Sequence, residues 1–130
     1  MNVVHIIETD RAVEDVGTRL EDAAKTHQFG VINVVDMNAK MKSKGVDFDP
    51  RCIIYEVCNP HRAKEVLEHK LEISTALPCR ISVYEEAGKT KLATLIPTQV
   101  LGLMGGDELL PVAESVQTDI FAMMDKAAGA

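Results

Sequence analysis

One cysteine stands at a point in the chain where a cysteine can become reactive. Residues 56–61 read Glu-Val-Cys-Asn-Pro-His, and this pattern predicts that a strand ends just before Cys58 and that a helix begins at Pro60, with Asn59 as its N-cap. Unpaired backbone N–H groups and the positive end of a helix dipole stabilise a thiolate at such a junction and lower the cysteine pKa. Cys58 is therefore the candidate nucleophile, and His61 could supply a nearby base or positive charge.

The same residues also have a purely structural interpretation. Free cysteine is among the most buried residue types, and a small side chain suits a tight junction between a strand and a helix. On this interpretation Cys58 serves packing alone, and His61 points to solvent. The sequence leaves both interpretations open.

Cys79 is the second thiol that could take part in chemistry. It follows Pro78 at the predicted start of a strand, where its face-mates Ile81 and Val83 are apolar, so we expect it to point into the core. A functional interpretation pairs it with Cys58 as a redox couple or a soft-metal site. Such a pair requires the two sulfurs to lie within disulfide or shared-ligand distance.

Whether the two cysteines meet depends on the chain between them. If a plain crossover links their strands, the strands run parallel and Cys58 and Cys79 lie at opposite ends of the sheet. If residues 72–77 return across the sheet, the second strand runs antiparallel and the thiols can meet.

A metal site built from Cys58, His61 and Cys79 would have three soft or borderline ligands. Three ligands suffice for an open zinc-type or copper-type site but not for a closed structural one, and their spacing is not a zinc motif. We therefore predict no metal and no other cofactor. Cys58, Cys79 and His61 remain the candidate catalytic residues.

Two carboxylates could line a binding cleft. Glu56 lies within a predicted strand, and Asp36 lies near the end of the strand before it. A carboxylate in an otherwise apolar strand must be paired or hydrated, so either one could face a cleft with a raised pKa. With Asn59 they form the predicted ligand-binding set, and an edge position facing water is the alternative for both carboxylates.

Hydrophobic patterns predict the elements that position these residues. Strands are predicted at residues 3–8, 31–36, 52–57, 79–85 and 90–96, and helices at residues 11–27, at residues 60–71 and from residue 107 onward. Residues 39–46 are expected to form a short polar helix or a loop. The order β-α-β-β-α-β-β-α predicts an α+β domain in which helices pack on one five-stranded sheet and the last two strands pair antiparallel.

Length and charge exclude several classes of function. A chain of 130 residues has room for one domain, which we place at residues 1–130. The net charge of −6 argues against binding to nucleic acid or to an anionic membrane surface. No apolar run approaches the roughly 20 residues of a spanning helix, and no basic region precedes the apolar start of the chain. We therefore expect a cytoplasmic protein, where an odd number of cysteines stays reduced.

Two motifs identify a family resemblance. The chain carries Ile54-Tyr55-Glu56-Val57-Cys58-Asn59-Pro60 and, further on, Leu77-Pro78-Cys79-Arg80-Ile81. With these motifs it resembles the domain-of-unknown-function family 302, a group of small prokaryotic proteins, over about residues 11–97. The resemblance implies a small α+β domain and a homodimer. It implies no catalytic residues, because the family has no established activity, and it implies that the thiols belong to a subgroup, because many relatives lack them.

Two functions fit these observations. The first is a non-enzymatic dimeric module that binds a small molecule or a partner protein in a cleft near Glu56 and Asp36, with the cysteines buried. The alternative is a thiol-based module for sulfur handling, redox sensing or soft-metal binding, in which Cys58 is the reactive thiolate and Cys79 the second thiol.

The last helix carries a further expectation about assembly. Its apolar face is predicted to be partly a subunit contact. The residues of that face are Val116, Ile120, Phe121 and Met124.

Overall fold

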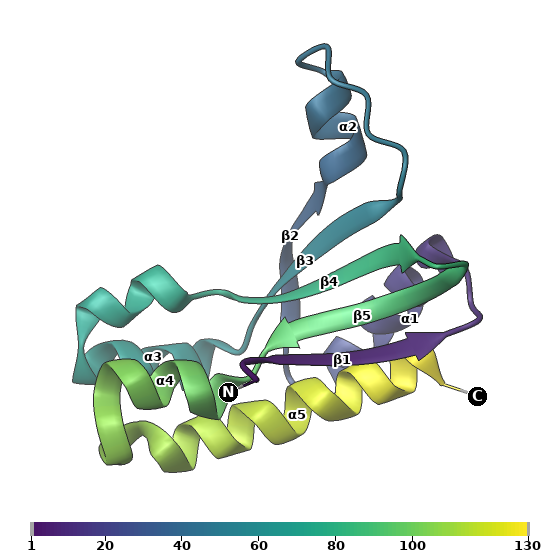
Figure 1. The fold of residues 1–130 in the computed structure, drawn as a ribbon. Helices are drawn as coiled ribbons and strands as arrows, with labels where there is room; N and C mark the ends of the chain where they lie inside the picture. Colours follow the sequence, from purple (N-terminus) through teal and green to yellow (C-terminus); the bar gives the residue numbers. More distant parts are fainter. Residues whose placement is uncertain (1, 130) are drawn as a thin grey trace.

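A computed structural model describes residues 2–129, which fold into one five-stranded sheet with five α-helices and two short 3-10 helices (Figure 1). The elements, in chain order, are β1 (Val4–Thr9), α1 (Val13–Thr26), β2 (Gly30–Asp36), α2 (Met37–Lys42), β3 (Cys52–Cys58), α3 (Pro60–His69), η1 (Leu71–Ala76), β4 (Cys79–Glu86), β5 (Lys89–Leu95), α4 (Pro97–Gly105), η2 (Gly106–Leu109) and α5 (Leu110–Ala128). The predicted α+β class and the predicted strands are confirmed.

The strands stand in the order β1-β5-β4-β3-β2, and every neighbouring pair is antiparallel. β3 and β4 pair with Val57 opposite Cys79. They can run antiparallel because α3 and η1 leave the end of β3 and return to the start of β4 at the same end of the sheet (Figure 1). Of the two topologies that the sequence left open, the antiparallel one is therefore correct.

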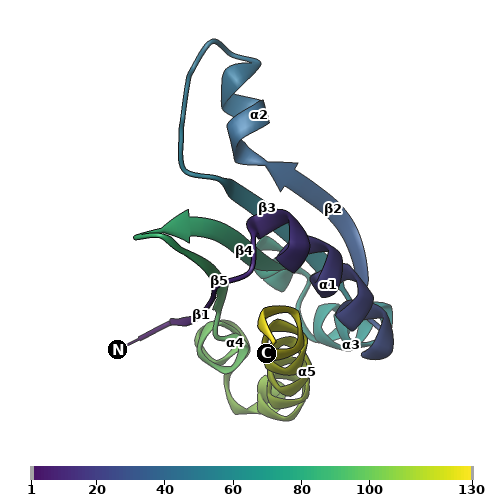
Figure 2. The same ribbon diagram turned by 90° about the vertical axis from the view of Figure 1, so that its right-hand side faces the viewer.

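Helices cover one face of the sheet and leave the other face open (Figure 2). α1 and α5 pack against each other, α5 contacts β1, and α1 contacts β4. Buried and partly exposed residues alternate along β3, as expected for a strand with one covered face. Ile53, Tyr55 and Val57 are the buried ones and face the helices. On the open face, Ile6 of β1 and Leu95 of β5 stay about half exposed, at 50% and 54%.

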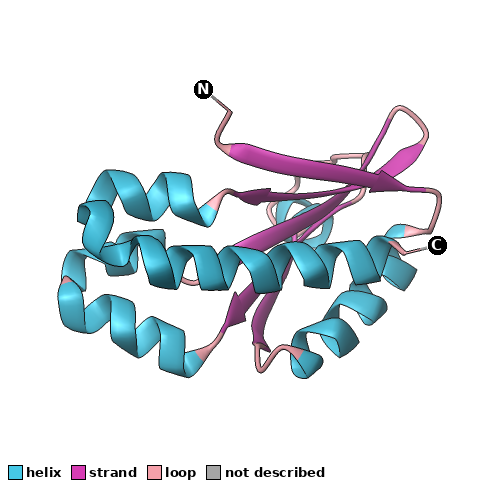
Figure 3. Cartoon of the chain, turned by 90° about the horizontal axis from the view of Figure 1, so that it is seen from below, coloured by secondary structure: helices cyan, strands magenta, loops and turns pink. Residues whose placement is uncertain are grey.

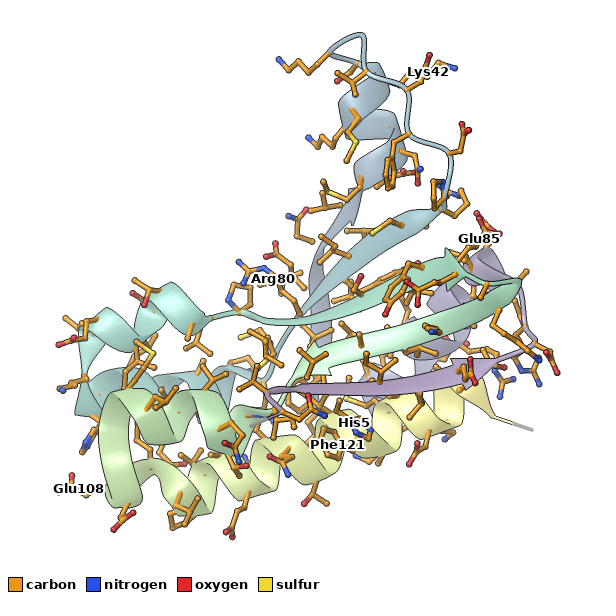
Figure 4. The ribbon with its side chains drawn as sticks, viewed as in Figure 1. His5, Lys42, Arg80, Glu85, Glu108 and Phe121 are labelled. Carbon is orange, nitrogen blue, oxygen red and sulfur yellow. The ribbon has the colours of Figure 1, made fainter. Side chains whose placement is uncertain are left out.

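The C-terminal helix is a core element of this layer, and it runs the length of the sheet in Figure 3. Val116, Ile120 and Met124 are buried within the chain itself. Phe121 stacks on His5 of β1, and both side chains are labelled in Figure 4. Their ring centroids are 3.9 Å apart. The chain itself therefore covers three of the four residues of the predicted subunit contact, and the fourth, Phe121, is partly buried.

Two helices differ from the sequence prediction. α4 is absent from the prediction, yet Pro97 occupies its first turn and Leu101 is buried against the rest of the chain. α5 begins three residues later than predicted, because η2 occupies the segment after a glycine break at Gly106, whose φ is 66°. Within residues 2–129, no helix combines the length and the apolar character that a bilayer crossing requires.

Residues 37–51, between β2 and β3, form an arm that stands away from the body of the molecule (Figure 1). The arm contains α2, in the region where a short polar helix or loop was predicted. Asn38 ties its two sides together, because its Nδ2 donates to the carbonyl oxygens of Phe48 at 2.8 Å and Pro50 at 2.7 Å. Val46 and Phe48 stay exposed on this arm.

Candidate functional site

A cavity of about 310 Å³ lies at the end of the sheet where β3 ends and β4 begins. Its walls come from β1, β3, β4 and β5 and from α3, η1, α4 and α5. Most of the lining side chains are apolar: Val4, Phe29, Ile54, Val57, Ala63, Val66, Ala76, Leu77, Pro78, Ala93, Leu95, Pro97, Val100, Leu101 and Val116. The others are Cys58, Asn59, Arg62, Cys79, Arg80, Ser82 and Thr94. Concave, mostly apolar walls with a few polar groups are the usual form of a small-molecule site.

The return of α3 and η1 to the sheet brings both predicted thiols into this cavity. Cys58 is the last residue of β3, and Cys79, the first residue of β4, lies opposite its neighbour Val57. Both cysteines line the cavity, and both are free thiols. From the sequence, a position of both cysteines at the same end of the sheet was only one of two alternatives.

Cys79 packs against the hydrophobic core, as predicted. Burial raises the pKa of its thiol to about 11, and the neighbouring Cys58 adds to the rise, whereas the Arg80 guanidinium opposes it. Cys79 is therefore a protonated thiol at neutral pH. Its surroundings are those of a packed side chain and do not favour a thiolate.

Asn59 forms the N-cap of α3, as predicted. Its Oδ1 accepts hydrogen bonds from the backbone N–H groups of His61 at 3.1 Å and Arg62 at 3.2 Å. The residue is only 6% exposed and lines the cavity. Within residues 2–129, its Nδ2 donates to no protein acceptor and is not a fully enclosed atom, so the amide N–H groups are left for solvent or a bound molecule.

Arg62 is a cavity residue that the sequence prediction missed. It lies in the first turn of α3, and its Nη1 donates to the hydroxyl of Ser115 on α5. The first turn of α3 contains no acidic residue. A signal for Arg62 was present in the sequence, because an arginine near a helix N-terminus opposes the helix dipole and needs a compensating reason to be there.

His61 is exposed and does not line the cavity. The structure therefore places Cys58 and Cys79 in the wall of one cavity and leaves the third predicted catalytic residue outside it. In the described part of the chain, no three His, Cys, Asp or Glu side chains lie close enough together to hold a metal ion.

Glu56 lies on the open face of the sheet, beside the cavity and not in its wall. Its Oε1 accepts from Asn33 Nδ2 at 2.8 Å, and its Oε2 accepts from Arg80 Nε at 2.9 Å. Arg80, which is labelled in Figure 4, does line the cavity. Glu56 therefore acts on the cavity through Arg80, whose charge it neutralises.

Asp36 lies away from the cavity, at the base of the arm. It caps α2, where its Oδ1 accepts from the backbone N–H of Ala39 at 3.0 Å, and it also accepts from Arg51 at 3.1 Å. The Ala39 N–H, followed by the Arg51 guanidinium, lowers the pKa of this carboxyl. The expectation of a raised pKa is therefore wrong for Asp36, because a capping carboxylate is held in its charged form.

The family model for the domain of unknown function DUF302 matches residues 5–127. The chain belongs to the DUF302 family. This match confirms the resemblance that was based on the cysteine motifs, and it extends the resemblance to nearly the whole chain.

One solved structure shows how closely another DUF302 protein shares this fold. The crystal structure of an uncharacterized conserved DUF302 protein from Bacillus stearothermophilus aligns with a TM-score of 0.91 and 31% sequence identity, over 98% of this chain and 99% of that chain. No curated protein sequence matches the chain. The function of this DUF302 domain must therefore be argued from its own cavity.

Proposed function

We propose that this DUF302 domain is a non-enzymatic module that binds a small, mostly apolar molecule in the cavity between the end of the sheet and α3, η1, α4 and α5. The observation that carries the proposal is the cavity itself, about 310 Å³ in volume with walls that are largely aliphatic. Transfer of an apolar ligand from water into a cavity with such walls has a favourable free energy of about 25 cal/mol per Å² of apolar surface buried. The few polar groups in the wall would set the ligand's orientation.

The volume of the cavity sets the size of a suitable first probe. If each water-sized group takes about 30 Å³, a cavity of this volume holds a molecule of about ten non-hydrogen atoms. 1-Octanol has this size and carries no charge, so it is a suitable first probe.

Calorimetric titration with 1-octanol tests this function. We expect saturable binding at one site per chain, and loss of that binding in Ala63→Phe, because Ala63 lines the cavity and a phenyl ring would fill it. Ala39→Phe is the matched control, since Ala39 is an exposed helical alanine on the arm. Failure of the wild-type protein to bind, or equal binding by Ala63→Phe, would contradict the proposed function.

The two thiols support a second candidate function, a thiol module for sulfur handling, redox sensing or soft-metal binding. The supporting observation is that Cys58 and Cys79 line one cavity and are both free, which also fits a reducing, cytoplasmic location. Iodoacetamide labelling across pH separates the candidates. A labelling midpoint for Cys58 well below about 8.5 supports the thiol module, and full protection of all three thiols contradicts it.

We also propose that the domain is a homodimer, in which a second copy covers the open face of the sheet. The half-exposed Ile6 and Leu95 give this face an apolar patch, and because Leu95 also lines the cavity the patch adjoins the proposed ligand site. Charge supports a second copy as the partner. The arm carries the basic residues Lys40, Lys42 and Lys44, whereas the chain as a whole has a net charge of −6, so the arm of one copy would be attracted to the acidic surface of another.

Light scattering at tens of micromolar protein tests the dimer. We expect twice the mass of one chain for the wild-type protein and the mass of one chain for Ile6→Glu, which places a charge in the patch. A monomeric wild-type protein would contradict the proposal.

A further inference from the structure

Arg62 brings a positive charge to the cavity that no acidic side chain balances. Among residues 2–129, no Asp or Glu oxygen forms an ion pair with its guanidinium, and its side-chain partner is the neutral hydroxyl of Ser115. Three of the other four arginines have acidic partners: Arg11 pairs with Asp15, Arg51 with Glu14 and Asp36, and Arg80 with Glu56. The fourth, Arg19, donates to the backbone carbonyl oxygens of Lys126 and Ala127 near the end of α5 and does not line the cavity.

The position of Arg62 makes this charge costly without a ligand. The guanidinium is partly buried beside apolar walls, and it lies in the first turn of α3, where the helix dipole is also positive. No acidic residue in that turn offsets either charge. An anion bound in the cavity would offset both.

Asn59 adds a neutral donor at the same place. The side chain is more than nine-tenths buried, it lines the cavity, and its Oδ1 is already engaged by the backbone of α3. Only the Nδ2 hydrogens of this side chain remain for a ligand. An acceptor oxygen in the cavity near the start of α3 would therefore meet a charged donor from Arg62 and a neutral donor from Asn59.

We propose that the ligand is an amphiphile with a single carboxylate, which binds between Arg62 and Asn59 while its aliphatic chain fills the apolar part of the cavity. This inference rests on the proposed function and names the ligand class of the same cavity. A singly charged head fits better than a phosphate dianion, because Glu56 already neutralises Arg80, the other arginine of the cavity. A planar carboxylate also matches the two-pronged geometry of a guanidinium.

Three probes with the same eight-carbon chain test the head group. We expect octanoate to bind the wild-type protein roughly tenfold more tightly than 1-octanol, since a hydrogen bond to a charged group is stronger than one to a neutral group. Octylamine, protonated at neutral pH, should bind more weakly than 1-octanol. If octanoate binds no more tightly than 1-octanol, or if octylamine binds most tightly, the carboxylate inference is wrong.

Two substitutions locate the head group. Arg62→Gln should weaken octanoate binding to about the level of 1-octanol and leave 1-octanol within about twofold of its wild-type affinity. Asn59→Asp keeps the helix cap but replaces the amide donor with a negative oxygen, so it should also weaken octanoate selectively.

Ser115→Ala is the matched control for Arg62. It removes the contact between α3 and α5 that Arg62 makes but retains the guanidinium, so octanoate should still bind more tightly than 1-octanol. Equal losses for octanoate and 1-octanol in Arg62→Gln would assign Arg62 a structural role and overturn the inference.

The outcomes also separate the two proposals. Binding of 1-octanol without any preference for octanoate removes the carboxylate and leaves the apolar-ligand function standing. Absence of binding by 1-octanol and octanoate alike removes the proposed function itself.

Discussion

The side chain of Asn59 holds the start of α3 with one end and leaves the other end to the cavity. Its oxygen satisfies two backbone N–H groups of α3, and its nitrogen is left without a protein acceptor among residues 2–129. The Asn-Pro pattern predicted the cap, and Asn59 was also among the predicted ligand-binding residues. Arg62 was missed although its place in the first turn of a predicted helix was a signal in the sequence, and its place in the cavity wall and its lack of an acidic partner could be learned only from the structure.

Cys79 gives the first prediction at the scale of single residues. Because burial raises its pKa to about 11, we expect iodoacetamide to label Cys79 very slowly at pH 8, where roughly a thousandth of this thiol is ionised. Labelling should rise steeply only toward pH 11. Mass mapping of the labelled peptides follows each cysteine separately.

The control for this experiment is the same protein in urea. There Cys79 should be labelled at pH 8 as fast as an ordinary thiol, because unfolding removes the burial that raises its pKa. If folded and unfolded protein label Cys79 at equal rates at pH 8, the buried environment described above is wrong.

At the scale of elements, the sequence predicted strands better than it predicted their arrangement. The apolar alternation of residues such as Ile53, Tyr55 and Val57 is local, so the strands could be placed within a residue or two. The direction of β4 depends on how α3 and η1 turn back, and Leu71–Ala76 carries no local pattern that decides this. α4 was missed because Gly102 and Gly105 lower its helix propensity, so its stability must come mainly from packing.

The cap of α3 leads to the second prediction. Asn59→Ala should lower the free energy of unfolding by about 1 kcal/mol, because two N–H groups of the helix lose their acceptor. Asn59→Asp should lose less, since a carboxylate oxygen can accept the same bonds beside the positive helix end. Urea unfolding followed by circular dichroism measures both, and a larger loss for Asn59→Asp would contradict this account of the cap.

Close packing between α1 and β3 leads to the third prediction. A Cβ atom added at Gly17 would overlap the Tyr55 hydroxyl and lie 2.8 Å from Tyr55 Cζ, and Tyr55 is only 5% exposed. Alanine normally stabilises a helix interior by about 1 kcal/mol over glycine, but overpacking a core costs about 1–3 kcal/mol. Gly17→Ala should therefore destabilise the protein by about 1–2 kcal/mol.

Gly102 offers a matched control, because a Cβ atom at this helical position would meet nothing within 4 Å. Gly102→Ala should be neutral or stabilising by up to about 1 kcal/mol. Tyr55→Phe combined with Gly17→Ala should recover part of the loss, because the overlapping hydroxyl is gone. The melting temperatures of the wild-type protein, the two single variants and the double variant test this prediction. Equal melting temperatures for Gly17→Ala and Gly102→Ala would refute the packing argument.

For the whole molecule, one-sided packing accounts for both the cavity and the open face. α1 and α5 cover the middle of the sheet, and α3, η1 and α4 extend beyond its end, where their apolar side chains meet across the cavity. Length and composition could predict one domain with a single core, because both features depend on the number of residues and on their total apolar content. The cavity could not be predicted in this way, because it depends on where eight elements leave space between them.

The buried Cys79 thiol and Tyr55 phenol should make the whole fold less stable in alkaline solution, which is the fourth prediction. Burial is the main cause that raises both pKa values, that of Cys79 from 9.0 to about 11 and that of Tyr55 above 10.0. Above the ordinary thiol pKa the unfolded chain therefore binds fewer protons than the folded chain, so stability falls as pH rises. Between about pH 9 and pH 11, Cys79 alone should remove about 2 kcal/mol.

Urea unfolding in reducing buffer between pH 7 and pH 10.5 measures this loss. The expected curve is flat below about pH 8 and falls above it, because the stabilising effect of the neutral thiol is fully present below the pKa of the unfolded chain. Cys79→Ala should start from a lower stability, since a packed side chain is truncated, but should fall less steeply. The slope is the decisive quantity, because truncation alone shifts the whole curve without changing its pH dependence. Parallel curves for the wild-type protein and Cys79→Ala would show that Cys79 is not the group that links alkaline pH to unfolding.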